Sequence, residues 1–236
     1  MTMWGLTKPT PWYAWRLLHY WQAGVLRLWI PFYEESGTAA HDVSKYGNNG
    51  TMYSGTTPTN LFNSGGKIGY GASFDGVDDY VEVPYSASLD NFDALTVECW
   101  IKPSVWADGV FRIFIDKGWA SVGGFVLYFH STVAGLLYFA TRDSVSTKNT
   151  YYTCPSLNQW YHVAGVFSKG QPNKVYVNGV KGTDSPATAD ETLTLNSAVK
   201  IGKSANDFQG IVDEVRIYNR ALTAQEIRAL YLITNV

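Results

Sequence analysis

The chain has 236 residues, of which 46% are hydrophobic and 16% are charged, so it holds enough apolar material for a folded core and lacks the composition of a disordered chain. A formal net charge of −2, without any run of Lys or Arg, excludes an electrostatic surface for nucleic acid. No apolar run reaches the roughly 18 residues that a membrane span requires.

The first 24 residues are predicted to form a Trp-rich N-terminal arm. Thr10 and Pro11 are typical of a helix start, the run 12–22 contains no helix breaker, and Gly24 is a plausible stop. Apolar side chains cover nearly the whole circumference of this helix, so it must be buried, either against its own sandwich or against a neighbouring subunit. We favour an assembly arm that docks on another subunit, in a homo-oligomer or on a capsid. Its tryptophans are Trp4, Trp12, Trp15 and Trp21.

Polar and charged residues interrupt the N-terminal apolar stretch, and no small-residue cleavage site follows it. The sequence therefore does not predict a secretory signal peptide.

From about Val25 onward, short segments with a period of two alternate with Gly, Asn, Asp and Ser clusters, as in a β-sandwich or barrel. In segment 79–83, Tyr80 and Glu82 are predicted on one face and Val81 and Val83 on the other. The other predicted strands are 95–101, 125–129, 160–167, 199–202 and 210–218, and segment 174–180 is predicted to be a hairpin.

Two of these segments have further predicted detail. In 95–101 the core side holds Leu95, Val97, Cys99 and Ile101, and the outward side holds Thr96, Glu98 and Trp100. Segment 125–129 is apolar almost throughout and is predicted to be covered on both faces.

Two local motifs predict how the chain turns. Asn178-Gly179 suits a type I′ hairpin turn, because both positions tolerate positive φ. Thr223 and Glu226 have capping-box spacing and predict a short C-terminal helix that ends at Tyr231.

Seven motifs occur in order along the chain: WIPFYEESGT (29–38), HDVSKYGNNGT (41–51), FDGVDDYVEVP (74–84), LTVECWIKP (95–103), WYHVAGVF (160–167), VYVNG (175–179) and GIVDEVRIYNRALT (210–223). Together they resemble the laminin-G-like, concanavalin A-like jelly-roll family, to which pentraxins are related. The resemblance covers about Val25 to Tyr231 and implies an all-β, two-sheet antiparallel jelly-roll sandwich as one domain over 25–236, preceded by the arm.

Because glucanases are structural relatives, hydrolysis is one alternative. Retaining glycosidases need two carboxylates about 5 Å apart, and laminarinase-like relatives carry them as Glu-x-Asp-x-x-Glu. None of the seven Glu residues is followed two positions later by Asp, and Asp213 and Glu214 are predicted on opposite faces of a strand. The sequence has no catalytic Ser or Cys motif, and no pair of Cys or His residues has the spacing of zinc ligands. We predict a non-catalytic protein, with a glycoside hydrolase the least favoured alternative.

Oxygen-donor residues suggest a structural Ca²⁺ site between the loop that holds Asp42 and Asn48 and the strand that holds Asp213. The resemblance implies that this loop and strand are neighbours, and relatives often hold Ca²⁺ there. The predicted ligands are Asp42, Asn48 and Asp213, since hard cations prefer carboxylate and carbonyl oxygens. The alternative is that Asp42 and Asn48 only bond loop backbone, as such residues do in turns. The acidic segment 75–79 is either a second cation site or a solvated turn, and we favour the turn.

A glycan site would combine aromatic rings with polar groups. The candidates on predicted loops are Trp106, Trp119, Tyr151 and Tyr152, each of which could also pack beneath its loop. Cys99 and Cys154 are predicted to be near neighbours, because pentraxins place a disulfide between comparable strands; a reducing compartment would leave them as thiols.

Two hypotheses for the function follow. The first is a virion structural or decoration protein that displays a lectin-like jelly roll on the virion surface for adhesion, because the arm together with 24–37 resembles laminin-G-like open reading frames of tailed bacteriophages. The second is a secreted or cell-surface lectin module that binds carbohydrate outside the cell.

Overall fold

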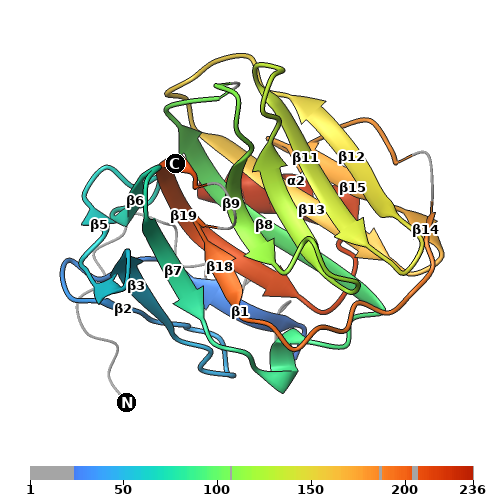
Figure 1. Cartoon of the computed structure of the whole chain (residues 1–236), viewed down its shortest axis with the longest axis horizontal. Helices are drawn as coiled ribbons and strands as arrows, with labels where there is room; N and C mark the ends of the chain where they lie inside the picture. The colour runs from blue at the N-terminus through green and yellow to red at the C-terminus, as the bar shows by residue number, and fades with distance from the viewer. Residues whose placement is uncertain (1–23, 107, 186–187, 204–206, 236) are drawn as a thin grey trace.

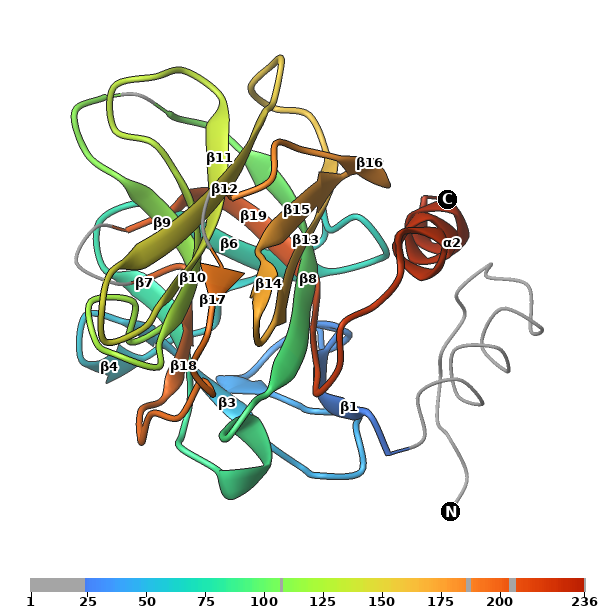
Figure 2. The same cartoon turned by 90° about the vertical axis from the view of Figure 1, so that its right-hand side faces the viewer.

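The structure, a computed structural model, describes residues 24–106, 108–185, 188–203 and 207–235. In these residues two antiparallel sheets lie face to face, and one α-helix lies outside the sandwich (Figures 1 and 2). The predicted two-sheet jelly-roll sandwich with a C-terminal helix is therefore confirmed. Residues 1–23 of the predicted arm lie outside the described residues. Within the described residues, none of the helices is both long and apolar enough to cross a bilayer.

The first sheet contains the strand that leads to the C-terminal helix. Its strand order is β16 (Val180–Lys181), β15 (Lys174–Val177), β13 (Tyr161–Ser168), β8 (Ala94–Pro103), β19 (Gln209–Tyr218), β6 (Gly71–Asp75) and β5 (Phe62–Asn63), and β1 (Leu26–Ile30) also pairs with β19.

The second sheet forms the opposite layer. Its strand order is β12 (Thr147–Thr153), β11 (Leu136–Arg142), β10 (Phe125–Phe129), β9 (Arg112–Lys117), β18 (Val199–Ile201), β7 (Asp79–Val83), β3 (Gly50–Ser54) and β2 (Ala39–Ala40), and β4 (Thr57–Pro58) pairs with β3. A short ribbon joins β14 (Gln171–Pro172) to β17 (Thr188–Ala189), and a 3₁₀ turn, η1, covers Ala87–Leu89.

The core fills the space between the two sheets. Because side chains alternate along a strand, one face of each strand points into this core. On β8 that face holds Leu95, Val97, Cys99 and Ile101, which are buried as predicted. The second sheet contributes Val81 and Val83 by the same rule, and leaves Tyr80 and Glu82 on its outer face.

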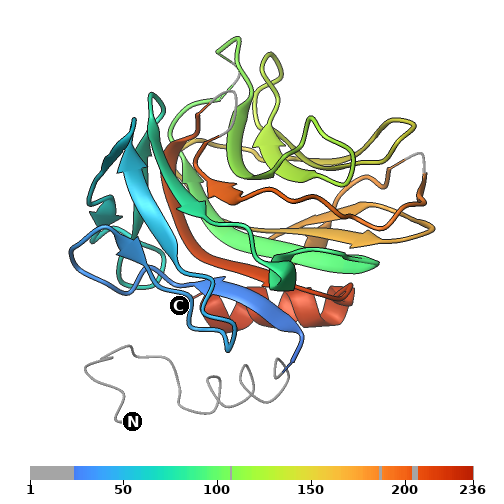
Figure 3. The same ribbon diagram turned by 60° about the horizontal axis from the view of Figure 1, so that its bottom comes forward.

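The outward side of β8 is placed as predicted, but it is covered. Thr96, Glu98 and Trp100 lie on the outer face, but all three are fully buried. The cause is the helix α2 (Ala224–Thr234), which lies against the outer face of the first sheet (Figures 2 and 3). Ile227 and Leu230 of this helix belong to a second apolar cluster on that face.

Helix α2 begins as predicted and extends beyond the predicted end at Tyr231. The Thr223 side chain accepts a hydrogen bond from the backbone of Glu226, and the Glu226 carboxylate accepts one from the backbone of Thr223. The helix continues to Thr234, whose hydroxyl accepts a hydrogen bond from the Trp100 indole at 2.9 Å. This bond attaches the last turn of the helix to the first sheet.

The hairpin turn between β15 and β16 is confirmed. Asn178 and Gly179 have φ values of 52° and 75°, so both central residues occupy the left-handed region that a type I′ turn requires.

A β-bulge corrects the prediction for Asp213 and Glu214. The pairing of β19 with β8 shifts between Asp213 and Arg216, and Glu214 has a φ of 55°. Val212 and Val215 both face the core, so the two acidic residues between them lie together on the outer face. The simple alternation of a regular strand fails here because the bulge adds one residue.

Segment 125–129 is also corrected in part. Phe125, Leu127 and Phe129 fill the core, but Tyr128 on the outer face of β10 remains partly exposed. The second sheet has no helix over this face among the described residues.

Both cysteines are free thiols buried in the core between the sheets. Burial raises the pKa of Cys154 to about 12 and raises that of Cys99 as well. Neither side chain is therefore a reactive thiolate in the folded protein.

The capping box makes the stability of α2 sensitive to acid. Hydrogen bonds from Arg220, together with the backbone of Thr223, outweigh partial burial and lower the pKa of Glu226 from 4.5 to about 2. A carboxylate with a depressed folded pKa stabilises fully above pH 4.5, and its contribution is lost as the pH falls from 4.5 to 2. We expect thermal melts to show a shallower loss of melting temperature over this pH range in Glu226→Gln than in the wild type. Glu35→Gln, at an exposed site, serves as the control and should follow the wild type; equal slopes for all three proteins would contradict the prediction.

Candidate functional site

Three tyrosines form a ladder across the outer face of the second sheet. Tyr128 of β10 lies directly opposite Tyr138 of β11, and Tyr138 lies opposite Tyr151 of β12. The ring centroids of Tyr128 and Tyr138 are 5.2 Å apart in a stacked arrangement, and those of Tyr138 and Tyr151 are 5.7 Å apart. We call these three residues the tyrosine ladder.

A shallow apolar hollow adjoins the ladder on the side of β9. Phe111, Ile113, Trp119 and Tyr128 line it. The Phe111 ring stands edge to face against Tyr128, with centroids 5.5 Å apart, and against His130, at 5.6 Å. The Asp116 carboxylate accepts a 2.8 Å hydrogen bond from the backbone of Trp119 and so anchors the loop that carries this indole.

The ladder presents phenol hydroxyl groups. Side chains on a sheet stand roughly perpendicular to it, so stacked rings turn their edges and hydroxyls outward. These hydroxyls bond to no residue that the structure describes. Burial raises the pKa of Tyr128, with a further contribution from Tyr138, and burial and Tyr151 raise that of Tyr138. Protonated phenols both donate and accept hydrogen bonds, which matches the groups of a sugar.

The four predicted ligand-binding residues fall in two places. Trp119 and Tyr151 belong to the outer aromatic face. Trp106 instead packs on Phe129 of the core, with ring centroids 5.5 Å apart, and Tyr152 packs against the core from the other side of β12. The prediction missed Tyr128 and Tyr138, although an aromatic residue at an outward position of each strand was a usable signal.

The predicted calcium ligands make hydrogen bonds of their own. Asp42 accepts bonds from the backbones of Trp29, Ser44 and Asn48 at 2.7 to 2.8 Å. The Asn48 amide donates to the Arg27 carbonyl at 2.8 Å. These contacts are those of an Asx-rich loop.

Asp213, the third predicted ligand, accepts hydrogen bonds from the backbones of Ile68 and Glu214 at 2.9 and 2.7 Å. It thereby holds the loop before β6 and the bulge of β19. A Ca²⁺ ion at Asp42, Asn48 and Asp213 stays a prediction.

The acidic segment 75–79 forms the turn between β6 and β7. Asp75 accepts bonds from the backbones of Val77 and Asp78, at 2.8 and 3.4 Å, as an Asx turn does. Carboxylate oxygens of Asp75, Asp78 and Asp79 also lie within 4.8 Å of one another. Burial, with the charge of Asp75, raises the pKa of Asp79. The turn interpretation accounts for these contacts.

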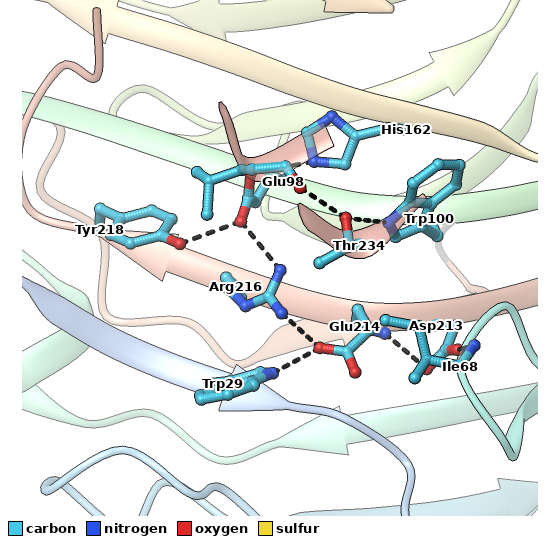
Figure 4. A network of polar contacts seen from close by, with 11 residues as sticks. Trp29, Ile68, Glu98, Trp100, His162, Asp213, Glu214, Arg216, Tyr218 and Thr234 are labelled. Atoms are coloured by element: carbon cyan, nitrogen blue, oxygen red, sulfur yellow. Dashed lines mark hydrogen bonds and ion pairs between the residues drawn. The ribbon is translucent and has the colours of Figure 1, made fainter. Parts of the chain in front are cut away.

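A second polar cluster lies buried between the first sheet and α2 (Figure 4). Arg216 donates to Glu98 at 3.1 Å and also to Glu214, and its guanidinium lies 4.7 Å from the ring centre of Trp29. Glu98 further accepts a 2.9 Å bond from Tyr218. We call Glu98, Glu214 and Arg216 the buried charge network.

Two further contacts extend this network. The His162 ring lies 3.1 Å from Glu98, and the Trp29 indole donates to Glu214 at 2.8 Å. Burial opposes ionisation of Glu98, but the hydrogen bond and charge of His162, with Arg216 and Tyr218, outweigh it and keep the pKa of Glu98 below its usual value.

The buried charge network does not have the form of a glycosidase site. Glu98 and Glu214 are at most 1% exposed, and both bond to the guanidinium between them. A glycosidase needs one carboxyl group free to protonate the leaving group and both groups in contact with substrate. Through their bonds to Trp29, His162, Arg216 and Tyr218, these carboxylates join β1, β8, β13 and β19 instead.

Comparison with known families supports the fold. The sequence profile described as the concanavalin A-like lectin/glucanases superfamily, a laminin-G type, matches residues 75–228. A search among curated proteins finds no match.

Several solved structures share this architecture. Domain 4 of an extracellular GH43 arabinanase from Geobacillus stearothermophilus, in complex with arabinotriose, is 19% identical with a TM-score of 0.62, over 88% of this chain and 98% of that domain. A structure of botulinum neurotoxin type C, a toxin whose cell entry depends on interaction with two ganglioside molecules, is 14% identical with a TM-score of 0.68. The match covers 90% of this chain and 52% of that one.

A Trypanosoma rangeli sialidase mutant with trans-sialidase activity is 18% identical with a TM-score of 0.66, over 95% of this chain and 38% of that one. The chain thus spans about half the length of the neurotoxin structures that it matches. Several of the similar structures are binding domains. At these identities the likeness shows the fold.

Proposed function

Because the chain belongs to the concanavalin A-like lectin/glucanases superfamily, we propose that it is a non-catalytic carbohydrate-binding protein whose binding face surrounds the tyrosine ladder. The observation that carries the proposal is the open row of Tyr128, Tyr138 and Tyr151, beside a hollow that Trp119 lines. Sugar sites combine apolar surface with a few hydrogen-bonding groups, and this face offers both.

Similar structures support a sugar as the ligand. The arabinanase domain is in complex with arabinotriose, and the neurotoxin interacts with gangliosides. The closed form of the buried charge network supports the non-catalytic part of the proposal, because its carboxylates are bonded and covered.

In this proposal the module adheres to glycans from the surface of a virion, to which the Trp-rich arm attaches it. The support is the resemblance of the arm and segment 24–37 to laminin-G-like reading frames of tailed bacteriophages. The alternative is an extracellular lectin module with the same binding face.

Tyr138→Ala is expected to weaken glycan binding at least about tenfold, which corresponds to about 1.4 kcal/mol. Tyr138 contacts both other rings of the ladder, so its loss removes the centre of the face. A glycan array identifies ligands of the wild type, and isothermal titration calorimetry measures both proteins. Tyr85→Ala, at an exposed tyrosine outside the ladder, is the matched control.

Retention of wild-type affinity by a folded Tyr138→Ala protein would contradict the proposed binding face. Absence of binding to every glycan on the array would contradict the proposed function as a whole. Hydrolysis of a bound β-glucan that a single Glu→Gln change abolishes would contradict the non-catalytic part.

A further inference from the structure

A second pair of stacked tyrosines lies on the same outer face, far from the ladder in sequence. Tyr53 of β3 lies directly opposite Tyr80 of β7, with ring centroids 5.0 Å apart and ring planes 19° apart. Both side chains are partly exposed, and their hydroxyls bond to no residue within the described ranges. This pair therefore repeats the chemistry of the ladder: ring edges and phenol hydroxyls on an open sheet face.

The pairing register places both sets of tyrosines in one row across the sheet. Leu127, Ile115, Ile201 and Val81 lie side by side on β10, β9, β18 and β7. Tyr128 follows Leu127, and Tyr80 precedes Val81. Because neighbouring strands run antiparallel, both tyrosines are displaced to the same side of that row.

The row has the length of an extended ligand. It runs over β12, β11, β10, β9, β18, β7 and β3, which are consecutive in the second sheet (Figure 1). Six strand spacings of about 4.8 Å give a span of about 29 Å. A monosaccharide reaches one end of this row, whereas a chain of several sugar units reaches both.

The charges between the two sets neutralise one another. Arg112 pairs with Asp108, Lys203 lies 3.8 Å from Asp207, and Lys200 lies 3.6 Å from Glu82.

Near the second pair, the acidic turn 75–79 adds negative charge, whereas the ammonium groups of Lys200 and Lys203 lie 5.6 and 4.9 Å from the Tyr80 ring centre. Among the described residues between the two sets, these cations are paired with carboxylates and the turn adds negative charge, so this part of the face suits an uncharged chain better than a polyanion.

We propose that Tyr53 and Tyr80 form a second sugar-contacting platform, and that the ligand is an extended, uncharged polysaccharide segment that lies across the strands and reaches both platforms. This inference rests on the proposed function, and it adds the length and charge class of the ligand. The two platforms act on one chain as linked sites, so occupation of the ladder raises the local concentration of sugar at Tyr80.

The test compares short and long oligosaccharides by isothermal titration calorimetry. The probes are the trisaccharide and the decasaccharide of the arabinan, xylan and β-1,3-glucan series. For the series that the wild type binds, the decasaccharide is expected to bind at least about tenfold more tightly than the trisaccharide. Tyr80→Ala should lose this gain and keep the trisaccharide affinity within about twofold, whereas Tyr138→Ala should weaken both probes.

Tyr80→Phe keeps the stack on Tyr53 and removes only the hydroxyl, so it tests the platform without disturbing the fold, and it should lose part of the gain. Tyr85→Ala is the control and should bind as the wild type. An unchanged length dependence in a folded Tyr80→Ala protein, or no length dependence in the wild type, would overturn the second platform. The proposed function would survive either result if Tyr138→Ala still weakened trisaccharide binding at least about tenfold.

Tighter binding of an alginate decasaccharide, which carries a carboxylate on each unit, would overturn the uncharged class. Failure of the wild type to bind any of these probes would overturn both proposals together.

Discussion

Replacing Arg216 by Met is expected to lower the free energy of unfolding by about 3–5 kcal/mol. The guanidinium is 1% exposed and bonds to both Glu98 and Glu214. Met occupies a similar volume without the charge, so the substitution leaves two carboxylates buried without their cation. Chemical denaturation of the wild type and the variant measures the loss.

Further variants distinguish the charge from the packing. Arg228→Met changes an exposed arginine on α2 and should stay within about 0.5 kcal/mol of the wild type. Adding Glu98→Gln and Glu214→Gln to Arg216→Met should recover part of the loss, because the buried carboxylates are then neutral. A loss below about 1 kcal/mol for Arg216→Met alone would show that these charges do not depend on the guanidinium.

Deletion of residues 1–24 is expected to leave a folded, soluble jelly roll that no longer assembles. The arm prediction rests on its tryptophans, since burying one large aromatic side chain is worth a few kcal/mol at roughly 25 cal/mol per Å². In an assembly arm, that free energy is gained on contact with another subunit. Light scattering should therefore report the loss of oligomers, and thermal melts should report a melting temperature near that of the full chain.

The alternative is an arm that packs on its own sandwich. In that case the same deletion exposes apolar surface and destabilises the domain by several kcal/mol. A truncated protein that melts far lower with an unchanged oligomeric state would contradict the assembly arm. A full-length variant with Trp12, Trp15 and Trp21 changed to Ser tests the side chains without shortening the chain.

Local patterns in the sequence determined several of the strands and their core faces, whereas β9, β11 and β12 were not predicted. An alternation of period two is a property of each strand alone, so Leu95, Val97 and Cys99 could be assigned to the core before any partner strand was known. The Asn178-Gly179 turn and the Thr223 capping box were equally local, because each depends on residues within one turn of the chain.

Only the tertiary structure decided what happens on the outer faces. Glu98 and Trp100 are buried because a helix more than a hundred positions later folds back over them, and nothing in segment 95–101 indicates this cover. The bulge at Glu214 likewise depends on how β19 pairs with β8, which strand alternation does not specify.

The candidate binding face has the same origin. Trp119 and Tyr151 could be selected from the sequence as accessible aromatic residues, but the tyrosine ladder exists because three separate strands pair in one register. The alignment of Tyr80 with Tyr128 depends on pairing through β18 and β9, between segments far apart in the chain. Which face a residue occupies is a local property of its strand, whereas which residues become neighbours across a sheet is set by long-range pairing.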